Sequence, residues 1–131
     1  MQDLPQPGAD QLRALARQSA AIAQACNCRN TDSSGWISLP LSLPETQLAD
    51  IATLIIDPYD EPTFAEYHPD GTRYDSPNAP IAPRHYPYNR CNVARCTLCG
   101  RHYLRYMEAG GYFVDRRIRA LDRPELVIEA A

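Results

Sequence analysis

The chain has 131 residues, of which 44% are hydrophobic and 22% are charged, and its formal net charge is −3. This length suits one ordinary folded domain, and the composition excludes an intrinsically disordered chain. No apolar run approaches the roughly 18 residues of a membrane-spanning helix, and the N-terminus lacks the basic and apolar segments of a secretory signal. We therefore expect a cytoplasmic protein without membrane contacts.

Positive and negative charges are unevenly distributed along the chain. Residues 1–83 contain four arginines and eleven acidic residues, whereas residues 84–123 contain nine arginines and three acidic residues. The chain has no lysine. Either the two halves attract each other within the fold, or the basic half faces an anionic partner. Attraction within the fold is favoured because both halves share one small domain.

The N-terminal region predicts a tail followed by a helix. Residues 1–9 are rich in proline and are expected to form a flexible tail, with a single domain over residues 10–131. From Asp10 to Cys26, apolar residues recur at helical spacing, which predicts an amphipathic helix of roughly four turns with Asp10 as its N-cap. Its alanine-rich face is suited to close packing on a sheet.

The middle of the chain predicts short elements. We expect a turn of helix after Pro44 and a strand over residues 53–57. Asp70 and Gly71 lie between β-prone segments, which is the pattern of a tight hairpin turn. Residues 78–87 contain three prolines and predict an extended connector.

The C-terminal region predicts a β-hairpin. Residues 101–108 and 112–121 are the expected strands, and Gly110 and Gly111 can adopt the dihedral angles of a tight turn between them. From Asp115 onward the apolar spacing also fits a helix, and both interpretations stay open.

Three cysteines lie within nine positions, at Cys91, Cys96 and Cys99. Two residues between Cys96 and Cys99 let a tight turn direct both sulfurs at one point, and Gly100 lets backbone amides tilt toward them. This segment, followed by the predicted hairpin, resembles the knuckle of a zinc ribbon. In a reducing compartment such spacing indicates metal or thiol chemistry rather than disulfides.

A closed zinc site needs four ligands, and Cys91 is close enough in sequence to be the third. The candidates for the fourth ligand are His102, His85 and the pair Cys26 and Cys28, with a bound water as the remaining alternative. The expected cofactor is Zn²⁺. The predicted metal ligands are Cys91, Cys96, Cys99, His102 and His85.

Three alternatives compete with zinc. The CxxxxCxxC spacing matches the first three ligands of a plant-type [2Fe–2S] ferredoxin, but no cysteine follows Cys99. A nucleophilic cysteine has a candidate base in His102, but no oxyanion site or orienting third group is recognisable. Unligated, buried cysteines are the third alternative.

Arginines and tyrosines surround the cysteines, a combination used by protein interfaces and by nucleic-acid surfaces. The acidic net charge and the absence of lysine disfavour nucleic acid, so we expect a protein partner. The residues predicted to contact this partner are Arg101, Arg105, Tyr103, Tyr106 and Arg117.

The chain resembles a family of small uncharacterised bacterial proteins that share a common core. Four segments carry this resemblance: DPYDEPTFAEYHPDGTRY, YNRC, CTLCGRHYLRY and GGYFVDRRIRAL. The resemblance spans roughly residues 53–122 and implies that they form one structural unit, without implying a reaction.

Together these patterns predict an α+β domain in which the amphipathic helix packs on a small antiparallel sheet with a zinc-ribbon-like C-terminal hairpin. The expected function is that of a zinc-stabilised adaptor or inhibitor of another protein, including a toxin-neutralising role. A small metal- or thiol-dependent enzyme is the main alternative. A nucleic-acid-binding zinc-ribbon protein and a [2Fe–2S] protein are further alternatives.

Overall fold

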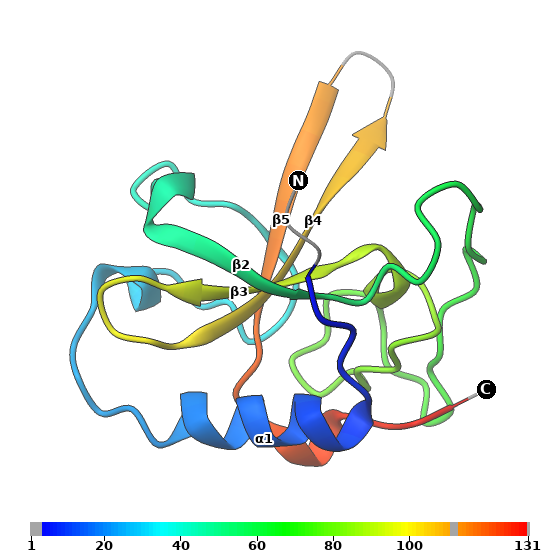
Figure 1. The fold of residues 1–131 in the computed structure, drawn as a ribbon, viewed down its shortest axis with the longest axis horizontal. Coiled ribbons are helices and arrows are strands. Elements are labelled where there is room, and N and C mark those ends of the chain that lie inside the picture. Colours follow the sequence, from blue (N-terminus) through cyan, green and yellow to red (C-terminus); the bar gives the residue numbers. More distant parts are fainter. Residues whose placement is uncertain (1–3, 111–112, 131) are drawn as a thin grey trace.

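The computed structural model describes residues 4–110 and 113–130. Within these residues, one α-helix packs on a five-stranded antiparallel sheet (Figure 1), which confirms the expected α+β class. The strands lie in the order β1-β5-β4-β3-β2. The elements are α1 (Ala9–Ala20), β1 (Ile37–Ser38), β2 (Leu48–Thr53), β3 (Asn92–Cys96), β4 (His102–Gly110) and β5 (Phe113–Ala120). The short 3₁₀ helices in the same part of the chain are η1 (Asn27–Arg29), η2 (Glu45–Gln47), η3 (Tyr88–Arg90) and η4 (Pro124–Leu126).

The helix α1 is shorter than the sequence predicted. It begins after Gly8, whose N–H donates to the Gln11 side chain, so Asp10 lies in the first turn rather than at the N-cap. It ends at Ala20, although the helical spacing continues further. Just beyond this end, the Ile22 carbonyl accepts a hydrogen bond from the Arg101 side chain in the turn between β3 and β4, and the chain leaves the helical path.

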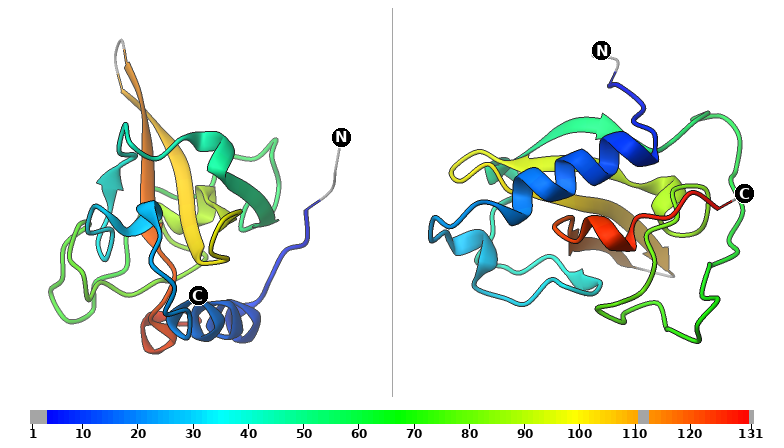
Figure 2. Two further views of the ribbon diagram at one scale, coloured as in Figure 1. Left: turned by 90° about the vertical axis from the view of Figure 1, so that its left-hand side faces the viewer. Right: turned by 90° about the horizontal axis from the view of Figure 1, so that it is seen from below.

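One face of α1 packs against the sheet and η4 (Figure 2). Leu12 and Ala16 are fully buried on this face. His102, the first residue of β4, donates from Nδ1 to the Leu15 carbonyl at 2.8 Å and from its backbone N–H to Ser19 Oγ at 3.0 Å. The start of β4 therefore fixes the C-terminal half of the helix.

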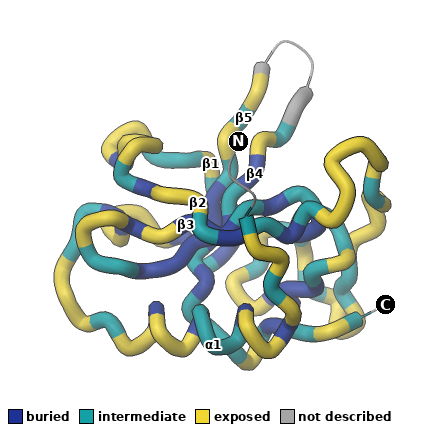
Figure 3. The backbone as a smooth tube through the Cα atoms, in the orientation of Figure 1, coloured by how far each residue is buried: buried dark blue, intermediate teal, exposed yellow. Residues whose placement is uncertain are grey.

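The sheet separates two buried clusters, because neighbouring residues of a strand face opposite sides. Val93 and Leu104 belong to the larger cluster, which includes the buried face of α1. Ala94 and Tyr103 belong to the smaller cluster, together with Cys28. Buried segments accordingly concentrate in the middle of the sheet (Figure 3).

The strands β4 and β5 form the predicted C-terminal hairpin, and residues 115–120 are strand rather than helix. Gly111 of the predicted turn lies outside the described residues. The neighbouring strand β3 pairs only with residues 102–105 of β4. The distal half of the hairpin therefore projects beyond the rest of the sheet (Figure 1).

The middle of the chain forms a helical turn and a strand, but the strand lies closer to the N-terminus than the predicted one. The turn η2 follows Pro44 as expected. The strand β2 pairs with β3 from Leu48, opposite Cys96, to Thr53, opposite Asn92. It thus ends where the predicted strand begins, because its position is set by the ladder with β3 rather than by its own apolar residues.

The predicted hairpin at Asp70 and Gly71 is wrong. The chain turns here, with Gly71 at φ 81° and its N–H bonded to the His68 carbonyl, but the described residues on both sides form no strands. His68 instead bonds to the side chain of Thr72 at 2.7 Å. Pro69 has no N–H to give a ladder, and local side-chain bonds replace strand pairing.

Arg119 of β5 is a buried anchor for the loops around the sheet, with an exposure of 1%. Its guanidinium donates to the carbonyls of Ser34, Pro77 and Ala79 and to the Tyr88 hydroxyl. A buried charge is costly unless hydrogen bonds satisfy it, and here neutral oxygens do so. Three separate segments are therefore held against one strand.

We expect Arg119→Met to lower the free energy of unfolding by about 3 kcal/mol or more, because several buried acceptors lose their donor. Arg116→Met is the control, since Arg116 is half-exposed and pairs with Glu45 at the surface. The control should cost about 1 kcal/mol or less. Urea denaturation of both variants measures the difference. Equal losses would contradict the anchoring role.

Candidate metal centre

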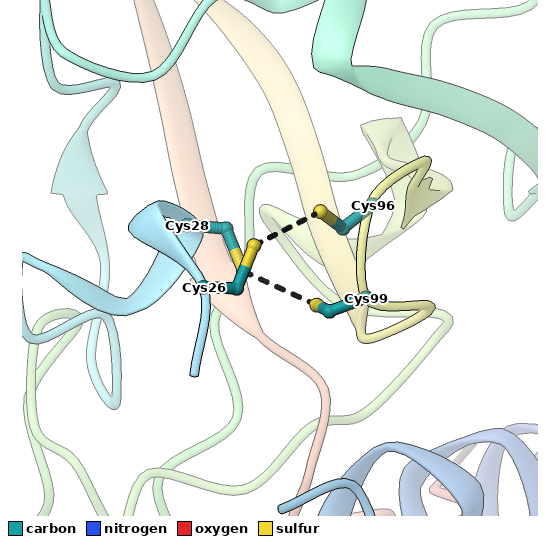
Figure 4. A group of neighbouring side chains, drawn as sticks. All are labelled: Cys26, Cys28, Cys96 and Cys99. Atoms are coloured by element: carbon teal, nitrogen blue, oxygen red, sulfur yellow. Dashed lines mark hydrogen bonds between the residues drawn. The ribbon is translucent and has the colours of Figure 1, made fainter. Parts of the chain in front are cut away.

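The CxxCG segment closes the hairpin between β3 and β4. Cys96 is the last residue of β3, and its carbonyl accepts a hydrogen bond from the Gly100 N–H at 2.9 Å. Gly100 has a φ of 88°, in the left-handed region that favours glycine. The segment therefore turns like a knuckle and presents Cys96 and Cys99 to the same side (Figure 4).

A second pair of thiols comes from the segment after α1. Cys26 immediately precedes η1 and Cys28 lies within it. Cys26 Sγ is 3.7 Å from Cys96 Sγ, and Cys28 Sγ is 3.6 Å from Cys99 Sγ (Figure 4). All four sulfurs lie within 4.8 Å of one another, and within the described part of the chain they form the one group with the spacing of a metal site.

These separations fit four ligands of a single ion. Sulfurs bound at about 2.3 Å to a tetrahedral zinc ion lie about 3.8 Å apart. A disulfide requires about 2.05 Å, and the five cysteines are free thiols. The four-cysteine cluster can therefore hold a metal ion such as zinc.

Polar side chains from the sheet and from η2 approach the sulfurs. Gln47 Nε2 lies 3.5 Å from Cys96 Sγ and 3.8 Å from Cys26 Sγ. The Tyr103 hydroxyl donates to Cys28 Sγ at 3.0 Å. Such donors orient ligands and favour the thiolate form that a metal requires.

Cys96 of the knuckle and Cys28 of η1 differ in the pKa of their thiols. Burial by itself raises the pKa of Cys96, but the Gln47 amide and the backbone N–H of Cys99 outweigh it and lower this pKa to about 6. Burial raises the pKa of Cys28 to about 12, although the Tyr103 hydroxyl opposes this effect. Cys28 thus needs a nearby cation to ionise near neutral pH.

Cys91, predicted as the third ligand, lies elsewhere. It is fully buried in the larger core cluster, and its thiol donates to the Pro87 carbonyl at 3.3 Å. It immediately precedes β3 while Cys96 ends that strand, and five extended residues span about 16 Å. The strand therefore keeps Cys91 away from the four-cysteine cluster.

Neither predicted histidine belongs to the cluster. His102 donates from Nδ1 to a backbone carbonyl of α1, and the His85 ring packs against Tyr67 at a tilt of 42°, with the ring centroids 5.1 Å apart. The sequence pattern predicted Cys26 and Cys28 only as alternatives for a single fourth ligand. Their CxC spacing was the available signal that both sulfurs are directed at one point.

The five residues predicted to contact a partner fall into two groups. Arg101, Tyr103 and Tyr106 are buried. Arg105 and Arg117 are half-buried and line a groove of about 310 Å³ beside β4 and β5. Tyr106 also lines this groove, although it is buried, whereas Arg101 and Tyr103 do not line it. Of these five residues, Arg105, Tyr106 and Arg117 therefore lie at the groove.

Arginines of the basic half and acids of the acidic half pair with each other along this groove. Arg105 Nη2 lies 2.9 Å from Asp50 Oδ1, and Arg116 Nε lies 2.7 Å from Glu45 Oε1. Part of the charge asymmetry is thus satisfied within the fold.

Comparison of the chain with protein-family models, with curated proteins and with solved structures gives no match. The resemblance to a small bacterial family therefore stays a prediction, and the candidate metal centre rests on the geometry of the four cysteines. Among the described residues, no helix has the length and apolar character needed to cross a membrane.

Serine substitutions distinguish the four-cysteine cluster from Cys91. We expect serine at any of the four cluster positions to abolish or strongly weaken metal binding, because the neutral hydroxyl is a poor replacement for a thiolate. Cys91→Ser should retain the metal, since the hydroxyl can still donate to the Pro87 carbonyl. Elemental analysis gives the metal-to-protein ratio. Loss of metal from Cys91→Ser with retention in Cys28→Ser would contradict the assignment.

Proposed function

We propose that the protein binds one zinc ion through Cys26, Cys28, Cys96 and Cys99. The observation that carries this proposal is the separation of the sulfurs, 3.7 Å and 3.6 Å for the two pairs that join the arms. The ion would join the segment after α1 to the β3–β4 hairpin.

Zinc suits this arrangement better than an iron–sulfur cluster. A [2Fe–2S] cluster distributes its cysteines over two irons, so sulfurs on different irons lie further apart than sulfurs on one ion. Here all four lie within 4.8 Å of one another. Four thiolates in a tetrahedron are typical of structural zinc.

The donor set supports a structural rather than a catalytic role. Four cysteines fill every position of a tetrahedral ion, whereas catalytic zinc keeps one position for water or substrate. Cys28 and Cys96 are buried, and the paired cysteines are 70 and 71 residues apart in the sequence. Metal binding would therefore supply folding free energy to a contact between distant segments.

The groove beside β4 and β5 supports a protein-binding role. It combines arginines with apolar side chains, including Met107, which is 64% exposed. Arginine and methionine are enriched at protein interfaces. Ion pairs such as that of Arg105 with Asp50 contribute little at a surface and can exchange for a partner's acidic groups. We infer that the protein acts as an adaptor or inhibitor of another protein.

Elemental analysis of the purified protein, with an absorption spectrum, tests the zinc proposal. We expect about one zinc per chain and no visible absorption. A chelator should lower the free energy of unfolding by several kcal/mol, because the binding energy of the ion is lost. Metal-free protein that stays folded would contradict the proposal. Iron in the protein, together with visible absorption, would show that the site holds an iron–sulfur cluster instead of zinc.

The double variant Met107→Ser, Arg117→Ser tests the groove. The variant should still bind the metal but no longer bind the partner protein, because the substitutions remove both an apolar side chain and a cation from the groove. Val114→Ser is the control, since Val114 is 56% exposed on the same hairpin but does not line the groove. Cross-linking in extracts of the source cells, read by mass spectrometry, compares the three proteins. Equal capture by all three, or capture of nucleic acid, would contradict this role.

A further inference from the structure

The strand β4 has an open backbone edge beyond the point where β3 begins. The His102 carbonyl accepts from the Leu121 N–H, so even-numbered residues of β4 bond to β5 and odd-numbered ones direct their N–H and C=O groups to the opposite edge. The strand β3 begins at Asn92, opposite Arg105. Met107 is the next residue that faces this edge, and no backbone group of the described chain bonds to it there. At least this position of β4 is therefore open to another strand.

A hollow of about 470 Å³ lies beside Met107. Its other lining residues are Asn89 and Arg90, from the segment just before β3, and members of the loop over residues 55–62. The hollow is therefore on the side of β4 from which β3 comes. There is room for an extended chain next to the open position.

The edge at Met107 lacks the protection that another edge of the same sheet has. At the outer edge of β2, the Thr53 N–H donates to the Pro5 carbonyl at 2.9 Å, so the N-terminal segment covers that strand. Proteins usually protect exposed edges with charges, prolines or a covering segment, because an open edge pairs readily with other chains. Met107 is apolar and 64% exposed. This edge is therefore suited to pairing rather than protected against it.

The groove next to the open edge carries an excess of positive charge. Its charged lining residues are four arginines and two acids: Arg90, Arg105, Arg116, Arg117, Glu45 and Asp50. The two acids pair with Arg105 and Arg116, and Arg117 pairs with acids of its own hairpin. In the described ranges, no carboxylate lies within ion-pair distance of Arg90. Arg90 is therefore the cation of this groove that can still take an acidic partner.

Arg90 is held in place beside the open edge. Its Cζ lies 4.1 Å from the centroid of the Phe64 ring, and its Nη2 donates to the Pro62 carbonyl at 2.9 Å. Its Nε is buried and has no hydrogen-bond partner within the described residues. The side chain lines both the groove and the hollow. A cation fixed in this way loses little conformational freedom when it pairs with an incoming carboxylate.

The opposite wall of the hollow limits what can bind. Asp57, Asp60 and Glu61 line it, and they would repel a nucleic acid or a run of carboxylates. An extended peptide with isolated acidic residues avoids most of this repulsion. A second copy of the chain, paired edge to edge, would bring the arginines of two grooves together, and like charges at an interface are costly. The charges therefore favour a segment of a different protein.

We propose that β4 accepts an extended segment of a partner protein as an additional strand, in which the backbone bonds to Met107 and an acidic side chain pairs with Arg90. In this mode of recognition, main-chain hydrogen bonds supply affinity and alternate side chains supply specificity. Apolar side chains of the segment would contact the Met107 side chain. The inference rests on the proposed protein-binding role of the groove and names the form and the charge of the partner segment.

A short synthetic peptide in which valine and glutamate alternate tests the proposal. In an NMR titration of the ¹⁵N-labelled protein, the Met107 amide should shift and its hydrogen exchange should slow, because its N–H becomes bonded. A peptide with glutamine in place of glutamate should bind about threefold more weakly, since the ion pair is lost. A glutamate peptide that does not bind, or that binds without slower exchange at Met107, would overturn the proposal. Equal binding of a peptide with lysine in place of glutamate would overturn the charge of the partner segment.

Proline substitutions test the backbone contact. Met107→Pro removes the outward N–H without removing a bond to β5, whereas Met107→Ala shortens the same side chain and keeps the N–H. The glutamate peptide should bind Met107→Pro about threefold or more weakly than Met107→Ala. Val114→Pro is the control, because Val114 pairs with Ala109 and faces the other edge of the hairpin, and it should bind like the wild type. Equal affinities of Met107→Pro and Met107→Ala would overturn strand addition.

Arg90→Gln tests the charge contact and carries the test if Met107→Pro does not fold. The variant should bind the glutamate and glutamine peptides equally, because the cation that distinguishes them is gone. This ratio of affinities does not depend on how far the substitution lowers stability. A preference for glutamate as large as that of the wild type would overturn the pairing with Arg90.

Further results separate this inference from the proposed function. If the double variant Met107→Ser, Arg117→Ser loses its partner in cell extracts while Met107→Pro keeps it, the groove binds a protein but strand addition is overturned. If neither variant loses the partner, the binding role of the groove is itself overturned. Dimerisation of the wild type that Met107→Pro abolishes would overturn the partner segment in favour of a second copy.

Discussion

The four thiols within 4.8 Å of one another set the constraint on which the rest of the structure depends. As thiolates they repel each other, and burial further disfavours their charged forms. A bound metal ion would offset both effects. The sulfurs come from two segments, one after α1 and one between β3 and β4, so the helix has to end before Cys26 for the cluster to form. Ala20 is the last helical residue, which leaves Cys26 and Cys28 free to reach the knuckle.

The start of β4 transmits the position of the knuckle to the helix. Arg101 and His102 follow the CxxCG segment directly, and they bind the carbonyls of Ile22 and Leu15. In β5, Arg119 donates hydrogen bonds to backbone carbonyls of loops that lie outside the strands. In a chain with few regular elements, buried arginines thus donate to backbone carbonyls that hydrogen bonds within helices and sheets satisfy in other proteins.

The placement of the cluster separates stability from recognition. Cys96 ends β3, whereas Asn92 at the other end of that strand lines the groove together with Arg105 and residues of β5. A closed metal site at the Cys96 end of β3 would stiffen the sheet without occupying the groove. This arrangement would suit the proposed binding protein, since a bound metal would contribute free energy to the fold and leave the groove available for a partner.

Local signals in the sequence were sufficient for the knuckle at Cys96 and Cys99 and for the C-terminal hairpin, because glycine after CxxC and alternation along a strand act over a few residues. They were not sufficient to predict which cysteines lie together. Cys91 is near Cys96 in sequence but is held about 16 Å away by the extended strand β3, whereas Cys26 is 70 residues away and its sulfur lies 3.7 Å from that of Cys96. Proximity of side chains depends on strand pairing and on hydrogen bonds between distant segments, which only the tertiary structure decides.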